Sequence, residues 1–309
     1  MTSSAAEVKE SVGPSVNEPA PVKKRARKRW RSEMSASTGL VLTLPLMAMV
    51  ALFLVYPMIR LVTLAVGPPR GADNFFSFFN LSANLVVLRV TFVDSAIVAV
   101  ICVILGGVVA WVISSTSRVA VRYGLIAAMF IPFWMGSVVK LYAFTILLER
   151  LGVVNRLLLD LHLISSPLGL IYNQTAVVIG MIYQLLPYSV LPLFVVFRSI
   201  DTDLLKAAQG LGASRARAIR SVVLPLGLPG ILASLTIVYV IGLGFFLTPV
   251  LLGGATSPFS ASFMYEDIFM FYNFTSAAVS AIVLLVGAFL VLLIASRLVG
   301  REQLRRVLG

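Results

Sequence analysis

Long apolar blocks separated by short polar segments dominate the pattern of this sequence. Six windows each hold about 20 mainly apolar residues, the length of helix that crosses the hydrocarbon core of a bilayer. These windows are residues 40–58, 90–114, 123–147, 175–197, 231–252 and 277–295. The sequence therefore predicts an all-α fold, a polytopic bundle of about six transmembrane helices.

Local features modify this picture in the fourth window and in the connections. The fourth window contains Pro187 and Pro192, so we expect a kinked helix, because neighbouring helices can satisfy the backbone groups that proline frees. Residues 74–88 and 155–163 have the apolar spacing of short surface helices. Two roles stay open for these segments, capping of the bundle and contact with a substrate.

The first 37 residues differ from the rest of the chain. They are rich in Ser, Pro, Glu and Lys and lack apolar periodicity, which predicts a disordered tail. Seven Lys and Arg residues lie between Lys23 and Arg31, just before the first window. A cleaved signal peptide has the same order of segments, but this window is too long and no small-residue cleavage site follows it. We therefore predict a retained first helix and a transmembrane domain over residues 38–309.

Composition and charge support a membrane protein. Of the 309 residues, 59% are hydrophobic and 12% charged, and the mean hydropathy is +0.97. The net charge of +12 is also typical of nucleic-acid binding, but the basic residues gather in the tail and at the ends of the apolar windows. With the N-terminus inside, 19 of the 25 Lys and Arg residues fall on the cytoplasmic side. Both termini are therefore predicted to be cytoplasmic.

Several chemistries are excluded by residue counts and motifs. The chain has one cysteine, Cys102, and one histidine, His162, too few for a disulfide framework or a Cys/His zinc cluster. It has no Gly-x-x-x-x-Gly-Lys-Ser/Thr sequence, so it cannot hydrolyse ATP by a P-loop. We predict no catalytic residue, no metal and no enzyme activity, and Cys102 is interpreted as a small packing residue.

The predicted cytoplasmic loop 198–230 carries the most specific signals. Asp201 and Ser214 are suited to cap two short helices, and Gly210 and Gly212 allow a sharp turn between them. Pro225 is expected to end the second helix. The loop is therefore either a docking knob of small residues or an ordinary basic loop.

This loop resembles the EAA loop of ABC importer permeases. The matching positions are Ala207, Ala208, Gly212 and the pair Leu224-Pro225, and Val222 stands in for the usual Ile. Lys206 stands where the family usually has Glu, and Gly210 where it often has Asp. The resemblance implies that an ATPase subunit binds the residues of this loop, which are Leu204, Leu205, Lys206, Ala207, Ala208, Gln209, Gly210, Leu211, Gly212, Ala213 and Ser214.

Other segments are similar to permeases of the spermidine/putrescine type. They are Pro132-Phe133-Trp134 with Lys140, Tyr142 and Ala143, Leu151-Gly152 with Asn155, Leu186-Pro187 with Leu191-Pro192, and the run Thr248 to Gly254. The resemblance implies the fold of type I ABC importer permeases and half of a translocation pathway for a small solute. It suggests a polyamine or a related amine or amino-acid derivative as the substrate.

The resemblance also implies partners and a location. The partners are a second homologous permease, two ATP-binding-cassette ATPase subunits, and a soluble binding protein that delivers the solute from the periplasm or the cell exterior. ATP and Mg would act on the ATPase subunits, so this chain needs no cofactor. The implied location is the bacterial inner membrane, and no nucleic-acid partner is expected.

Polar residues within or beside the windows are candidates for the substrate pathway. Asp94 and Lys140 are expected to lie at a similar depth in the outer half of the membrane, where they either form an ion pair or contact a substrate. Glu266 and Asp267 would face the binding protein or a cationic substrate at the outer mouth, or belong to a solvated loop. The full set of candidates is Asp94, Trp134, Lys140, Tyr142, Tyr183, Gln184, Tyr188, Glu266 and Asp267.

A secondary transporter is the principal alternative class. Such a protein would be expected to show inverted repeats and interrupted helices near the middle of the membrane, and the sequence has no clear internal repeat. A membrane anchor for another complex is a further alternative, and it would transport nothing.

Overall fold

A computed structural model describes residues 36–254 and 257–308. The predicted disordered tail lies outside this range except for its last two residues. The chain divides into two compact units, Met1–Phe53 and Leu54–Gly309. In the first unit the described residues form α1 (Ala36–Val50) and the beginning of a π-helical turn, η1 (Ala51–Val55).

The second unit contains the remaining helices, and the described residues form no strand. This confirms the all-α prediction. The helices are α2 (Tyr56–Ala65), α3 (Asp73–Asn80), α4 (Ser82–Ser115), α5 (Val119–Trp134), α6 (Ser137–Leu148), α7 (Val153–Asp160), α8 (Gln174–Ser199), α9 (Thr202–Gly210), α10 (Arg215–Ala218), η2 (Ile219–Val223), α11 (Leu224–Leu243), η3 (Pro249–Gly253), α12 (Ser260–Phe269) and α13 (Phe274–Leu308).

Five helical segments of the described residues are long and apolar enough to cross a membrane. They are Thr43–Ala65, Ser82–Ser115, Gln174–Ser199, Arg215–Leu243 and Phe274–Ile294. A sixth span results if the bent pair Val119–Trp134 and Ser137–Asp160 is counted as one. The structure thus agrees with the prediction of about six transmembrane helices.

The third apolar window, residues 123–147, forms two helices instead of one. α5 ends at Trp134, and the following helical segment is turned from it by 102°. Pro132 has no amide hydrogen to continue the helix, and the extended backbone of Met135 and Gly136 separates the two helices. The composition of this window is therefore that of a membrane span, whereas its geometry is that of a broken span.

The fifth apolar window begins earlier in the structure than in the sequence analysis. Pro225 was expected to end a short helix, but it lies in the first turn of α11, directly after η2. Proline is accommodated there because the π-helical turn η2 directly before it interrupts the regular hydrogen bonding of the α-helix. One helical run therefore extends from Arg215 to Leu243.

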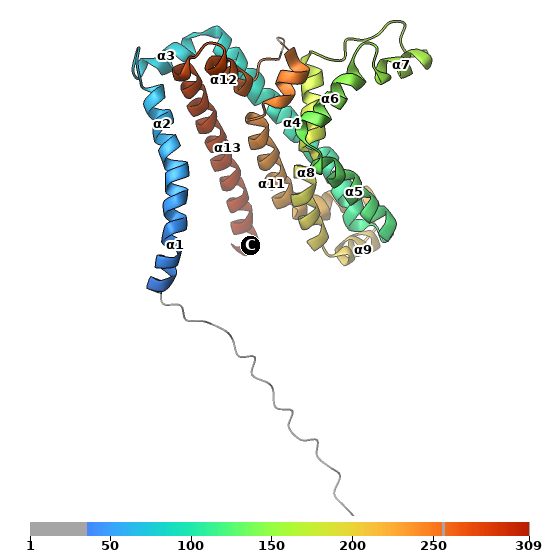
Figure 1. Ribbon diagram of the computed structural model, residues 1–309. Coiled ribbons are helices and arrows are strands. Elements are labelled where there is room, and N and C mark those ends of the chain that lie inside the picture. The colour runs from blue at the N-terminus through green and yellow to red at the C-terminus, as the bar shows by residue number, and fades with distance from the viewer. Residues whose placement is uncertain (1–35, 255–256, 309) are drawn as a thin grey trace, which may run out of the picture. The chain divides into compact units, whose positions relative to one another are not determined.

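Three helices, α4, α8 and α11, pack against one another to form the core of the second unit (Figure 1). A polar contact joins all three at Ser189 of α8. Its hydroxyl donates to the carbonyl oxygen of Cys102 in α4 at 2.8 Å, and its carbonyl accepts from the Ser234 hydroxyl of α11 at 2.9 Å. Within membranes, small residues and such hydrogen bonds stabilise helix pairs, since lipid supplies no hydrophobic drive between them.

Apolar clusters surround this contact. The largest contains Val98, Val177, Met181 and Val238, and Cys102 is fully buried in it as a packing residue. A second cluster, which includes Ile113, Leu193, Phe197 and Val223, lies closer to α9. Figure 1 shows that within this unit α9 lies at the opposite end of the long helices from α3, α7 and α12.

We predict that Gly106→Leu destabilises the protein by about 1–3 kcal/mol, the range for overpacking a close contact. A side chain at Gly106 would collide with the hydroxyl of Ser189 and would separate α4 from α8. The matched control is Gly107→Leu, because a Cβ at Gly107 meets no atom within 4 Å. Thermal unfolding in detergent measures both variants, and equal melting temperatures would contradict the tight contact.

Candidate functional site

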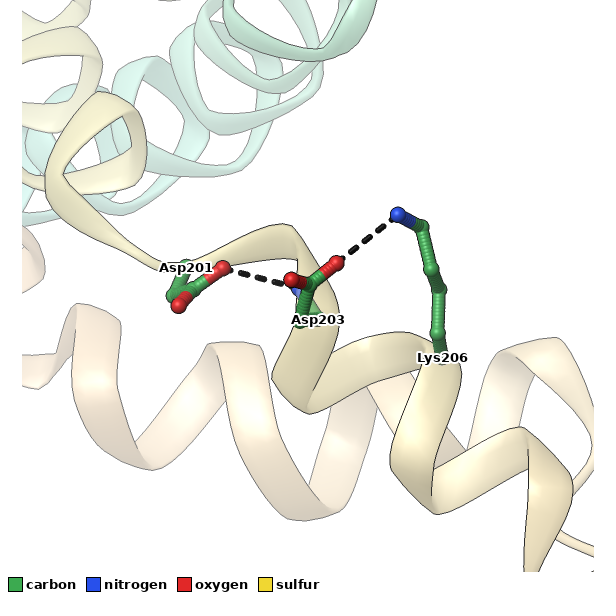
Figure 2. Close-up of polar contacts among 3 residues, drawn as sticks. All are labelled: Asp201, Asp203 and Lys206. Carbon is green, nitrogen blue, oxygen red and sulfur yellow. Dashed lines mark hydrogen bonds and ion pairs between the residues drawn. The ribbon is translucent and has the colours of Figure 1, made fainter.

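The loop between α8 and α11 forms the two short helices that its sequence predicts. The Asp201 carboxylate caps α9 by accepting from the Asp203 amide at 2.9 Å (Figure 2). The Ser214 hydroxyl caps α10 by accepting from the Arg217 amide at 3.3 Å. Both caps satisfy amide groups that the first turn of a helix leaves unpaired.

A tight turn at Gly212 ends α9. The amide of Gly212 donates to the Gln209 carbonyl at 2.9 Å, and the amide of Ala213 donates to the Ala208 carbonyl at 3.1 Å. Gly212 has a φ of +88°, a left-handed conformation that glycine adopts without the steric cost of a Cβ. This residue therefore sets the angle between α9 and α10.

One face of α9 is attached to the helix bundle, while the other is exposed. Leu205 packs against the cluster of Ile113, Leu193 and Phe197. On the outer face Ala207 is exposed, and Leu211, at the end of the helix, exposes 91% of its surface. A single exposed apolar side chain is common on protein surfaces, so the distinguishing feature of this face is its small side chains.

Lys206 has an intramolecular partner on the same helix. Its ammonium lies 2.8 Å from the Asp203 carboxylate, one turn earlier in α9 (Figure 2). The hydrogen bond and charge of Lys206 lower the pKa of Asp203, and those of Asp203 raise the pKa of Lys206. Both residues are therefore charged at neutral pH. Because both side chains are 75% exposed, solvent screens the pair and its contribution to stability is small.

Asp94 has a different partner from the one the sequence suggested. It is fully buried in α4, and its carboxylate accepts from the Gln174 amide at 2.7 Å. Among the described residues no ion pair joins Asp94 to Lys140. The expected pairing assumed a straight third span, whereas Lys140 follows the 102° bend and so does not lie at the depth that a continuous helix would give.

Lys140 instead lies in a small, mainly apolar pocket between α5, α6 and α8. The lysine is buried, and the pocket, of about 50 Å³, is also lined by Phe133, Tyr183 and Gln184. The Gln184 amide donates to the Thr248 hydroxyl at 3.1 Å. The structure thus brings together three of the candidate pathway residues, Lys140, Tyr183 and Gln184.

The aromatic candidates are distributed around this pocket. Tyr188 stacks edge-on against Phe133, with ring centroids 5.3 Å apart. Trp134 and Tyr142 do not line the pocket, and Trp134 exposes 88% of its surface. Of the aromatic candidates, Tyr183 therefore lines the pocket directly, and Tyr188 contacts it through the Phe133 ring.

The two acidic residues of α12 have different environments. Glu266 is exposed, whereas Asp267 is buried. Burial raises the pKa of Asp267, and a hydrogen bond with Ser276 opposes that effect. Glu266 is therefore exposed at the end of the bundle that carries α12, while Asp267 is packed between α12 and α13.

Sequence reasoning missed two polar partners, Gln174 and Thr248. Gln174 is the first residue of α8 and directly precedes the apolar window 175–197. A search for polar residues inside the apolar windows therefore misses it. Thr248 belongs to the run that resembles other permeases, but nothing in the sequence indicates that it accepts from Gln184. Both contacts depend on helix packing.

Comparison with known proteins identifies the family. The model of the binding-protein-dependent transport system inner membrane component family matches residues 102–302. The spermidine/putrescine transport system permease protein PotB of Escherichia coli K12 is 32% identical over 204 residues, which cover 65% of this chain and 74% of PotB. The PotB protein of Haemophilus influenzae is 33% identical, and the alignment spans 60% of this chain and 65% of that protein.

Solved structures share the fold. A bacterial ABC transporter involved in the import of the acidic polysaccharide alginate aligns over 84% of this chain and 94% of its own, with a TM-score of 0.69 and 20% identity. The alginate transporter in complex with a periplasmic protein bound to an alginate pentasaccharide gives a TM-score of 0.73. Because the family model matches more than half of the sequence and the fold agrees, this chain belongs to the family of binding-protein-dependent transport system inner membrane components, the permease subunits of ABC importers.

Proposed function

We propose that this chain forms one half of the translocation pathway of an ATP-driven importer and that residues 204–214 bind one of its ATPase subunits. The observation that carries the proposal is the form of α9, a short helix capped at both ends. Its outer face is exposed and its inner face is attached to the bundle through Leu205. The family membership supports the same role.

The attachment of α9 explains how motion would reach the transmembrane helices. The connection from α8 to α9 is Ile200 and Asp201, and the connection from α9 to α10 is 211–214. Such short connections restrict movement of α9 relative to its neighbours, and Leu205 packs against the cluster that contains Phe197. A displacement of α9 by the ATPase would therefore move α8 and α11 together, as in a rigid-body transition of packed helices.

ATP would drive this transition by binding the closed ATPase dimer more tightly than the open one. A near-complete shift between two states requires about 5.5 kcal/mol of differential binding. The chain itself contributes no ATP site, so ATP and Mg act on the partner ATPase subunits. A second homologous permease would complete the pathway, and a soluble binding protein would deliver the solute.

We also propose that α9 and both termini face the cytoplasm. The support is the distribution of Lys and Arg along the sequence, 19 of 25 on the predicted cytoplasmic side. The exposed Glu266 belongs to α12, at the end of the second unit opposite to α9 (Figure 1). In this orientation Glu266 would face the binding protein.

A polyamine or a related amine or amino-acid derivative is the proposed solute. The support is the similarity to the two PotB proteins at 32–33% identity. Tyr183 and Gln184, which line the pocket beside Lys140, are the proposed contact with amine groups of the solute, and Lys140 could contact only a carboxylate, as in an amino-acid derivative. Its small size suits one functional group, so most of the selection would fall to the binding protein.

Uptake of labelled putrescine and spermidine tests the class of solute and the energy source. Cells that express this chain with its partner subunits and binding protein are expected to accumulate one of the two amines. Accumulation should stop when cytosolic ATP is depleted and should persist when the proton gradient is collapsed. The reverse pattern would favour a secondary transporter, and accumulation of neither amine would contradict the polyamine assignment.

Gly212→Asp is expected to reduce uptake to background while the protein remains in the membrane. The left-handed backbone at Gly212 costs a residue with a Cβ about 1–2 kcal/mol, and the added side chain would alter the angle of α9. The matched control is Gly210→Asp, which adds the same charge at a residue with open space around it. Uptake at equal expression is the measurement, and normal uptake by Gly212→Asp would contradict the role of this turn.

Ala207→Trp is expected to weaken ATPase binding at least tenfold. A bulky side chain on the exposed face of α9 would prevent close contact between this helix and the surface of the ATPase subunit. Ser117→Trp, in the exposed connection between α4 and α5, places the same side chain elsewhere and should bind normally. Copurification of the ATPase subunits with the tagged permease measures the difference. Equal recovery with both variants would remove α9 from the interface.

A further inference from the structure

A pocket of about 430 Å³ lies behind α9, where α4 and α8 end. Its walls come from the last turns of these two helices, from α9 and from the first residue of α10. The apolar part of the lining includes Trp111, Phe197 and Leu205, and the charged part consists of Arg198, Lys206 and Arg215. Two exposed residues of α9, Lys206 and Gln209, also line it.

The lining is strongly basic. It contains three cations and no carboxylate. Lys206 has its own counterion in Asp203, whereas no ion pair is recorded for Arg198 or Arg215 among the described residues. The Arg198 guanidinium lies 5.9 Å from the centroid of the Phe194 ring, an attractive contact that leaves its positive charge uncompensated. The complementary ligand is therefore an anion.

The position of the pocket along the spans identifies the kind of anion. The candidate spans Ser82–Ser115 and Gln174–Ser199 both end at this pocket, which places it at the level of the lipid headgroups. Trp111 lies in the last turns of α4 and packs edge-on against Phe197, with ring centroids 5.9 Å apart. Tryptophan is enriched at this depth because its indole combines an apolar body with a polar edge.

We propose that this pocket binds the headgroup of an anionic phospholipid. Arg198 and Arg215 would contact the phosphate, while Trp111, Phe197 and Leu205 would contact the glycerol backbone and the first methylene groups. Basic pockets between transmembrane helices suit such headgroups, since each cation near the surface adds to the attraction. The proposal depends on the membrane location of the chain. The pocket shares Leu205, Lys206 and Gln209 with the residues proposed to bind the ATPase, and lipid binding is measured separately from recovery of the ATPase.

A lipid at this position would contact both α9 and the ends of α4 and α8. It would fill the space between α9 and the helix ends and so support α9 on the side of Leu205. Charged lipid would then stabilise the orientation of α9 relative to the bundle.

Lipid titration of the full-length chain, copurified with its partner subunits and then delipidated in detergent, tests the proposal. Dioleoyl phosphatidylglycerol should bind more tightly than dioleoyl phosphatidylcholine, as measured by native mass spectrometry. The double variant Arg198→Gln/Arg215→Gln should lose affinity for phosphatidylglycerol by roughly 25-fold, from the contribution of two surface cations. Its affinity for phosphatidylcholine should not change.

Two further variants separate the pocket from general effects of charge and folding. Arg217→Gln/Arg220→Gln removes the same charge from exposed neighbours that do not line the pocket, and it should retain the preference for phosphatidylglycerol. Arg198→Lys/Arg215→Lys keeps the charge and should retain most of the affinity. An equal loss in the Arg217/Arg220 variant, or equal binding of both lipids by the unmodified chain, would overturn the proposal.

Competing ligands give the remaining outcomes. Glycerol 1-phosphate should compete only weakly with phosphatidylglycerol, because it lacks the acyl chains. Competition at equal concentrations would assign the pocket to a soluble anion and overturn the lipid site. Selective lipid binding that appears only after the ATPase subunits are removed would assign the pocket to an acidic side chain of those subunits, which would overturn the proposal as well.

Discussion

The contact of α4, α8 and α11 at Ser189 is the constraint on which the rest of the second unit depends. Inside a bilayer the backbone must satisfy its own hydrogen bonds, so the fold is helical, and helices associate only where their surfaces allow close approach. Gly106 provides that approach in α4, and the carbonyl and hydroxyl of Ser189 connect both neighbours. The outer helices and the loop with α9 are built onto this centre.

The α9 loop is held in a defined orientation on this core. Two side-chain caps and the Gly212 turn fix the helix ends, and Leu205 fixes its inner face against the Phe197 cluster. These features are local, short in sequence and independent of a bound partner. A preformed surface of this kind loses little conformational entropy when it binds, which suits the proposed ATPase contact.

Much of the fold could be predicted from the sequence because the signals are local. The lengths of the apolar windows predicted the transmembrane spans. The two short helices of the loop were predicted from Asp201, Gly212 and Ser214, since caps and turns depend on a few neighbouring residues. Tertiary contacts were not accessible in this way. The partner of Asp94 is Gln174, 80 residues away, and the depth of Lys140 depends on a 102° bend that composition does not reveal. Pro225 showed the same limit, because a proline that can end one helix can also begin the next.

The ion pair between Lys206 and Asp203 has a consequence for the speed and ionic requirements of assembly. Because each charge is balanced within one turn of the helix, Lys206 and Asp203 together add little to the long-range positive field of the nearby Arg198 and Arg215. In the proposed importer, α9 itself would then bind through shape and short-range packing, and any dependence of the affinity on ionic strength would come from the neighbouring arginines. The pair can therefore leave a partner surface and rejoin it without capturing or releasing counterions of its own.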